Sequence, residues 1–187
     1  MSEHRVQRRV AGYHDIRMDG MTDLVIRARD RRVMDIGCNR GLVGFEMANN
    51  GAAMVHGCDI YAEGIAAARE IFADLRSVKS QFEVVDLRKG PKAFAAFNGQ
   101  QYDITLMLAT YHKLKRVMMP QDLTALVGYI ASITTMYFAW RGTSEKASEN
   151  EGEMAALDQC LRPLGLKRVH TSYLSTELGV AAIWNRC

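Results

Sequence analysis

The feature that most limits how this chain can fold is a regular alternation of short apolar runs with segments of helical periodicity. The apolar runs have the length of buried strands and occupy residues 32–36, 52–59, 81–87, 102–108 and 134–140. The segments with helical spacing occupy residues 41–50, 62–75, 91–97, 120–132 and 153–161. Strands that alternate with helices in this way favour a parallel sheet with helices on both faces.

The last part of the chain breaks this alternation. Two strand-like segments, 166–172 and 180–185, are separated only by a short polar stretch, so we expect them to pair as a hairpin. We therefore predict an α/β fold: a three-layer sandwich around a mostly parallel seven-stranded sheet, with a C-terminal antiparallel hairpin strand. Residues 141–152 are polar and lack a hydrophobic period, which predicts a mobile loop.

Length and composition fit one soluble domain. A chain of 187 residues with 48% hydrophobic and 24% charged residues can build a single ordinary core. We assign this domain to residues 31–187 and treat residues 1–30 as a basic N-terminal arm or helix that belongs to the domain or covers it. No apolar run reaches the roughly 18–20 residues of a membrane helix, and the first residues lack the apolar core of a signal peptide. These features predict a cytoplasmic protein without a membrane partner.

The cysteines and the net charge say little about which ligands or partners the protein binds. The four cysteines form no CxxC pair and no framework-like spacing, so we expect reduced thiols and no metal site. The net charge of +3 identifies no partner, but the first 32 residues hold eight arginines against five acidic residues. Arginine forks match phosphates well, so nucleic acid stays an open partner of this arm. The alternative interpretation is a solvated helix face with mixed charges.

The strongest local motif follows the first strand and opens the first helix. It places Gly37 and Gly41 around Asn39, whose residue type tolerates left-handed backbone angles better than other non-glycine residues. Free N–H groups at the start of the following helix suit a polar ligand. Such a turn is shared by several nucleotide sites and also occurs as a purely structural turn. The GxGxxG spacing of dinucleotide enzymes is absent, because three residues separate the two glycines.

Three acidic residues, Asp35, Asp59 and Asp86, lie at or near the ends of the first three predicted strands. In an open α/β sheet, the carboxyl ends of neighbouring strands line the ligand crevice. Asp59 is placed to accept hydrogen bonds from a ribose diol, and Asp86 to accept one from the exocyclic amine of adenine. The alternative is that these acids only cap the helices that follow the strands.

The segments VMDIGCNRGLVG, CDIY, VVDLR and YDITLMLATYHKL, in this order, resemble the class I S-adenosylmethionine-dependent methyltransferases. The resemblance covers about residues 31–187 and includes the closing pair of strands. It implies S-adenosylmethionine as cofactor and methyl transfer to an acceptor that the sequence does not identify: a small molecule, a protein or an RNA. The alternative is a non-catalytic S-adenosylmethionine-binding subunit that activates or anchors a partner enzyme, because this fold also hosts such proteins.

The resemblance also implies which residues hold the cofactor. Asp35 orders the glycine turn, and Gly37 and Gly41 let the backbone approach the methionine part. Asp59 takes the ribose hydroxyls, and Asp86 with the Leu87 amide holds adenine. The family usually has glycine at the centre of the loop, where this chain has an asparagine. The complete set of implied cofactor-binding residues is Asp35, Gly37, Cys38, Asn39, Gly41, Asp59, Ile60, Asp86, Leu87 and Leu108.

The segment after the fourth strand faces the methyl group in that family. We hypothesise that His112 takes a proton from the acceptor and that Tyr111 shapes or hydrogen-bonds the acceptor. The alternative is a surface histidine that begins a basic helix. The chain lacks the Asn/Asp-Pro-Pro-aromatic tetrapeptide and the suitably placed cysteine of DNA-base methyltransferases, which disfavours that activity. The candidate covers for the cofactor are residues 141–152 and, in the arm, Tyr13, His14 and Arg17.

Overall fold

The structure is a computed structural model that describes residues 20–97, 99–173 and 179–187. The strands are β1 (Arg32–Ile36), β2 (Met54–Asp59), β3 (Lys79–Val84), β4 (Tyr102–Leu108), β5 (Thr134–Gly142), β6 (Leu166–Tyr173) and β7 (Val180–Arg186). The α-helices are α2 (Thr22–Ile26), α3 (Leu42–Asn49), α4 (Ala62–Ala73), α5 (Tyr111–Lys115), α6 (Pro120–Ile133) and α7 (Ala147–Leu161). The 3-10 helices are η1 (Leu87–Phe97), which is kinked at Gly90, and η2 (Arg162–Leu164).

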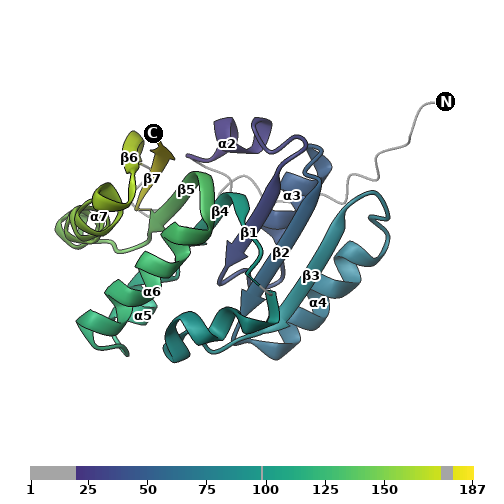
Figure 1. The fold of residues 1–187 in the computed structure, drawn as a ribbon, viewed down its shortest axis with the longest axis horizontal. Helices are drawn as coiled ribbons and strands as arrows, with labels where there is room; N and C mark the ends of the chain where they lie inside the picture. The colour runs from purple at the N-terminus through teal and green to yellow at the C-terminus, as the bar shows by residue number, and fades with distance from the viewer. Residues whose placement is uncertain (1–19, 98, 174–178) are drawn as a thin grey trace.

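These strands form one seven-stranded sheet in the order β3-β2-β1-β4-β5-β7-β6. Neighbouring strands from β3 to β5 run parallel, whereas β7 runs antiparallel to both β5 and β6. Figure 1 shows the sheet crossing the molecule from β3 on one side to β6 and β7 on the other. The predicted three-layer α/β fold with a C-terminal hairpin is confirmed.

The two faces of the sheet support two apolar cores, because successive side chains of a strand point to opposite faces. Val33 packs into the core shared with α2, α3 and α4, and its neighbour Met34 packs into the core shared with η1, α6 and α7. Both side chains are fully buried. Helices on both faces leave the carboxyl ends of the parallel strands as the natural place for a ligand crevice.

The prediction of a mobile loop over residues 141–152 is wrong at both of its ends. β5 continues through Gly142, because Arg141 and Gly142 pair with Ala181 and Val180 of β7. At the other end α7 begins at Ala147, six residues before the expected helix start at residue 153. Only residues 143–146 lie between these two elements, so this segment is a short connection and not a long cover.

The start of α7 was not predicted from hydrophobic periodicity, because the first residues on its buried face are polar. The buried residues of the helix include Asn150 and Glu153 ahead of Met154 and Leu157. Asn150 fixes the first turn by accepting from the N–H of Ser144 at 3.1 Å and donating to its carbonyl at 2.7 Å. Elsewhere the boundaries move little: β3 ends at Val84 instead of residue 87, and β2 begins at Met54 instead of residue 52.

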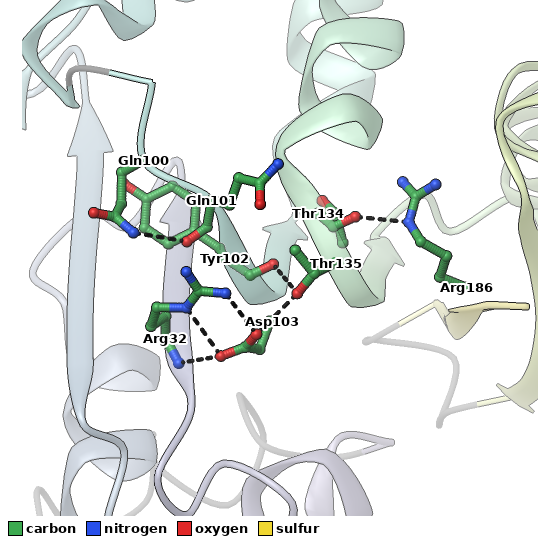
Figure 2. Close-up of polar contacts among 8 residues, drawn as sticks. All are labelled: Arg32, Gln100, Gln101, Tyr102, Asp103, Thr134, Thr135 and Arg186. Atoms are coloured by element: carbon green, nitrogen blue, oxygen red, sulfur yellow. Dashed lines mark hydrogen bonds and ion pairs between the residues drawn. The ribbon is translucent and has the colours of Figure 1, made fainter.

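Polar contacts join the amino ends of β1, β4 and β5, as Figure 2 shows. The backbone N–H and Nη2 of Arg32 donate to the two carboxylate oxygens of Asp103, each at 2.9 Å, and Oγ1 of Thr135 donates to the same carboxylate at 2.8 Å. Burial alone would raise the pKa of Asp103, but these hydrogen bonds outweigh it and lower the pKa to about 2. The carboxylate is therefore ionised in the folded protein and links the amino ends of three neighbouring strands.

Part of the predicted N-terminal arm packs on the domain. α2 buries Leu24 and Val25 in the core shared with α3 and α4. The candidate covering residues Tyr13, His14 and Arg17 lie outside the described residues. None of the helices in the described ranges has the length and apolar character that crossing a membrane requires.

Candidate cofactor-binding site

A cavity of about 570 Å³ opens at the carboxyl ends of the parallel strands. Its walls are the turn after β1, the ends of β2, β4 and β5, the segment that follows β3, and helix α5. Pockets of about 300–1,000 Å³ are typical of small-molecule sites in proteins. The cavity lies where the topology of the sheet predicts a ligand.

The glycine turn after β1 forms one wall and has the left-handed backbone that its sequence predicts. The φ angles of Gly37, Asn39 and Gly41 are 76°, 51° and 70°. The N–H groups of Gly37 and Cys38 donate to the carbonyl of Cys58 at 2.8 and 3.0 Å, which anchors the turn to the end of β2. Gly41 is the N-cap residue of α3 and, unlike the other two, does not line the cavity.

Position 37 also requires glycine because the end of β4 packs against it and leaves no room for a side chain. A Cβ at this position would overlap Oγ1 of Thr110. That hydroxyl lies 3.2 Å from the carbonyl oxygen of Ile36 and 3.1 Å from that of Leu108, so it bridges the ends of β1 and β4. Thr110 and Gly37 therefore hold each other in place at the floor of the cavity.

Asp59 at the end of β2 organises the two turns beside it. Its carboxylate accepts the backbone N–H of Asn39 at 2.8 Å and that of Tyr61 at 3.0 Å, one at each oxygen. Each carboxylate oxygen has two lone pairs, so both retain capacity toward the cavity, which Asp59 lines. The same side chain thus shapes the turn and presents acceptors to a ligand.

Asp86 lies in the segment after β3 and is paired with Arg88. Nε and Nη2 of Arg88 donate to the two carboxylate oxygens at 2.9 and 2.8 Å. The hydrogen bonds from this side chain lower the pKa of Asp86 to about 2, so the carboxylate is held ionised. Both residues line the cavity. The Arg88 partner was not foreseen because the two residues lie where the chain passes from β3 into η1, and a pair two residues apart there leaves no periodic signal.

Asp35 and Cys38 form the inner wall. Asp35 is only 3% exposed and faces the cavity from the end of β1. Burial raises the pKa of the Cys38 thiol, whose Sγ donates to the carbonyl of Asn39 at 3.7 Å. Cys38 is therefore a neutral thiol that packs against the turn, and it is unsuited to act as a nucleophile.

Apolar side chains complete the walls. They belong to Val43, Ile60, Val85, Leu87, Leu108, Leu114 and Val117. Apolar side chains next to carboxylate acceptors are chemically suited to a nucleoside: the base packs on the apolar side chains, and the hydroxyls and amine donate to the carboxylates.

The end of β4 carries features that the sequence did not reveal. Ala109 has a φ of 55°, which is uncommon for a residue other than glycine and often marks a functional turn. Its N–H donates to the carbonyl of Arg141 at 3.0 Å, which ties it to β5. Ala109, Thr110, Lys113 and Arg141 all line the cavity. Arg141 was missed because it was assigned to the loop, and Ala109 because alanine gives no local signal.

The structure does not bring Tyr111 and His112 into the cavity. Tyr111 does not line the cavity and is buried in the core that also contains Leu114, where burial raises its pKa to about 12. His112 is half-buried, and its pKa is lowered by burial and by the neighbouring charges of Lys113 and Arg116. Its Nδ1 is buried and has no hydrogen-bond partner within the described residues. The catalytic roles of Tyr111 and His112 remain predictions, and the geometry gives them no direct contact with the cavity.

The two histidines that lie on the described strands, His56 and His170, do not line the cavity either. Nδ1 of His56 lies 2.8 Å from the hydroxyl of Tyr102 in the interior, where the ring also stacks on Phe97. His170 lies on β6, at the far edge of the sheet. Within residues 20–97, 99–173 and 179–187, no group of three or more His, Cys, Asp and Glu side chains is arranged to hold a metal ion.

Comparison with known proteins agrees with this geometry. Residues 33–132 match a family model described as a methyltransferase domain, which is more than half of the 187-residue chain. No curated protein sequence is similar enough to match the chain.

Three solved structures illustrate the likeness in fold. Magnesium protoporphyrin IX methyltransferase from Synechocystis PCC 6803, solved with bound S-adenosylmethionine, has a TM-score of 0.68 and 20% identity over 100% of this chain and 86% of that chain. The PH0226 protein from Pyrococcus horikoshii OT3 has a TM-score of 0.67 and 15% identity over 95% and 93% of the two chains. N-methyltransferase NodS from Bradyrhizobium japonicum WM9 has a TM-score of 0.62 and 11% identity over 88% and 93%. The matching family model, together with the motifs and the sheet topology, shows that the chain belongs to the methyltransferase-domain family of class I S-adenosylmethionine-dependent methyltransferases.

Proposed function

We propose that the cavity binds S-adenosylmethionine along the ends of β3, β2 and β1 and turns its methyl group toward β4 and β5, where the acceptor binds. The observation that carries this proposal is the order of the polar groups along the sheet edge. Asp86, Asp59 and Asp35 follow one another in the order of the strands β3, β2 and β1, and all three line one cavity.

The chemistry of each position supports the direction of the cofactor. Asp59 retains acceptor capacity for the two ribose hydroxyls, and Asp86 offers a carboxylate beside the apolar side chains of Ile60 and Leu87, which suit adenine. The left-handed turn of Gly37 and Asn39 opens the backbone toward the methionine part. When bound, S-adenosylmethionine supplies a methyl carbon on a cationic sulfur, and an acceptor lone pair displaces the sulfur from that carbon.

The protein contributes positioning to such a displacement. Holding the acceptor in line with the methyl carbon replaces an encounter in solution by a preorganised approach. Ala109 and Thr110 define the surface at the end of β4. The Thr110 hydroxyl donates to the carbonyl of Ile36 in β1, and the N–H of Ala109 donates to the carbonyl of Arg141 in β5. A rigid floor at this position suits a reaction that depends on alignment.

A labelled transfer experiment tests the proposal. Purified protein is incubated with methyl-labelled S-adenosylmethionine and, in separate reactions, with the small-molecule, protein and RNA fractions of the cells that express it. We expect label in one fraction and none with the Asp59→Asn variant, which controls for contaminating methyltransferases. Equal label with both proteins, or no label in any fraction although the protein binds the cofactor, would contradict methyl transfer by this cavity.

A further inference from the structure

The charges around the cavity are separated along the sheet edge. The three acidic residues lie at β3, β2 and β1, whereas Arg141 lies at the end of β5, on the far side of β4. Arg141 stands opposite Leu108 in the pairing of β4 with β5. If the cofactor runs from β3 to β1, as proposed above, this arginine lies beyond the methyl group, at the acceptor end.

The burial of Arg141 makes it more than a surface charge. Arg141 is 7% exposed and still lines the cavity. Its backbone is fixed by pairing with both β4 and β7, and its carbonyl accepts the N–H of Ala109 at 3.0 Å. A guanidinium does not lose its proton in proteins, and a buried charge is costly unless it is compensated.

Arg141 also interacts with another group of the chain. The guanidinium presents five N–H donors in a planar fork, so it can hold a partner in the chain and an anion at the same time. Carboxylate and phosphate groups match the fork with two parallel hydrogen bonds.

Lys113 supplies a second positive charge to the same cavity. It lies on α5, directly after the end of β4, and its exposed side chain lines the cavity beside Leu114 and Val117. Unlike Arg88, which Asp86 neutralises at the opposite end, Lys113 forms no ion pair within the described residues. The acceptor end therefore combines two cationic groups with apolar surface.

We infer that Arg141 and Lys113 form an anion subsite, and that the methyl acceptor is an organic anion whose carboxylate or phosphate binds there. The apolar body of such an acceptor lies against Leu114 and Val117. The inference rests on the proposed function for its assignment of the two ends of the cavity. It identifies the group by which the protein recognises the acceptor, and it does not say which atom receives the methyl group.

The test uses simple probes on protein saturated with S-adenosylhomocysteine. Benzoate and phenyl phosphate carry the two anionic groups on an apolar ring, and benzamide is the neutral match. Calorimetric titration is expected to show binding of at least one anion and weaker binding of benzamide. In Arg141→Met the anion affinity is expected to fall by about tenfold or more, since charge-assisted hydrogen bonds are lost.

Matched variants separate the subsite from the general charge of the protein. Lys113→Gln is expected to weaken anion binding by about threefold, as for an exposed charge, and Lys115→Gln on the same helix to leave it unchanged. Arg141→Lys keeps the charge without the fork and is expected to retain part of the affinity, which guards against a variant that fails to fold.

The outcomes distinguish this inference from the proposed function. If the wild-type protein does not bind S-adenosylhomocysteine, the proposed function fails. If it binds S-adenosylhomocysteine but neither anion, or binds the anions equally well in Arg141→Met, only the anion subsite is overturned. If Arg141→Met folds but loses affinity for S-adenosylhomocysteine, the guanidinium serves the carboxylate of the cofactor, and the inference is overturned as well.

Discussion

Gly37 is the residue at which backbone conformation and packing restrict the site most. Its φ of 76° is a left-handed angle, and a side chain there would overlap Thr110. We predict that Gly37→Ala lowers the free energy of unfolding by about 1–3 kcal/mol, because the angle is strained for alanine and the end of β4 has to move. Urea denaturation measures this change, and titration with S-adenosylhomocysteine is expected to show weaker binding in the same variant.

Gly128 provides the matched control for that substitution. It lies in α6, and a Cβ added there meets no atom within 4 Å. Gly128→Ala is expected to raise the free energy of unfolding by about 0.5–1 kcal/mol, since alanine favours helix more than glycine does. If both variants were equally stable, the account of Gly37 would be wrong.

At this scale the sequence predicted backbone angles better than side-chain partners. The left-handed angle of Asn39 followed from its residue type and its place between two glycines. The ion pair of Asp86 with Arg88 was not predicted, because it depends on how the chain passes from β3 into η1, where the sequence has no periodic pattern. The buried position of Arg141 was missed for a similar reason: a charged residue at the end of an apolar run was taken as the start of a loop.

Polar contacts link the elements at the amino ends of β1, β4 and β5, where Arg32 and Thr135 donate hydrogen bonds to Asp103. The pKa of Asp103 is lowered to about 2 in the folded protein. A lowered pKa gives stability that is present above the ordinary pKa of aspartate and is lost as the pH falls toward the folded value.

We predict that the wild-type protein loses about 1.5 kcal/mol more stability than Asp103→Asn between about pH 6 and pH 2.5. Urea denaturation of the two proteins at both pH values measures this difference in stability loss. The contributions of the other acidic residues are common to both proteins and cancel. An identical acid dependence of the two proteins would contradict the role given to this carboxylate.

Glu153 in helix α7 is expected to give the stability of the protein the opposite dependence on pH. Glu153 is 4% exposed, its Oε2 has no hydrogen-bond partner in the described part of the chain, and burial raises its pKa. A raised pKa gives stability that is present below the ordinary pKa of glutamate and is lost as the pH rises through the folded value. We predict that stability falls between pH 4.5 and pH 7.5 more steeply in the wild type than in Glu153→Gln. Denaturation curves at the two pH values measure this, and parallel pH profiles would rule out the explanation.

The same helix shows where prediction of elements from sequence reached its limit. Strands and helices with apolar buried faces, such as β1 and α6, were placed within about two residues. The first turns of α7 bury Asn150 and Glu153, so the buried face carries no apolar signal and the helix was taken as a loop. Tertiary packing decided the conformation there.

For the whole molecule, the alternation of strands and helices was enough to predict the sheet with its closing hairpin, because few topologies satisfy it. The ends of the strands were enough to indicate the edge of the sheet at which the cavity opens. The sequence pointed to the segment after β4 as the proposed acceptor end, but it did not indicate Arg141 and Lys113, which come from β5 and α5 and line one cavity only in the folded chain.

A ligand that binds only the folded protein raises its stability as a whole. At a concentration of S-adenosylhomocysteine about 100 times its Kd, we predict a gain of about 2.7 kcal/mol and a rise in Tm of about 5–10 °C. A thermal melt followed by circular dichroism measures it, with adenosine monophosphate as a control that lacks the amino-acid part. A Tm that does not change with S-adenosylhomocysteine would contradict a cofactor site in the fold.

The measurement that tests the central claim most directly is calorimetric titration with S-adenosylmethionine of the wild type, Asp59→Asn and Glu63→Gln. Asp59 accepts two backbone N–H groups and faces the cavity, whereas Glu63 is an exposed acid in the first turn of α4. We predict binding by the wild type and by Glu63→Gln, and an affinity at least about tenfold lower in Asp59→Asn. Failure of the folded wild type to bind, or equal affinity in all three proteins, would contradict a cofactor site built on Asp59.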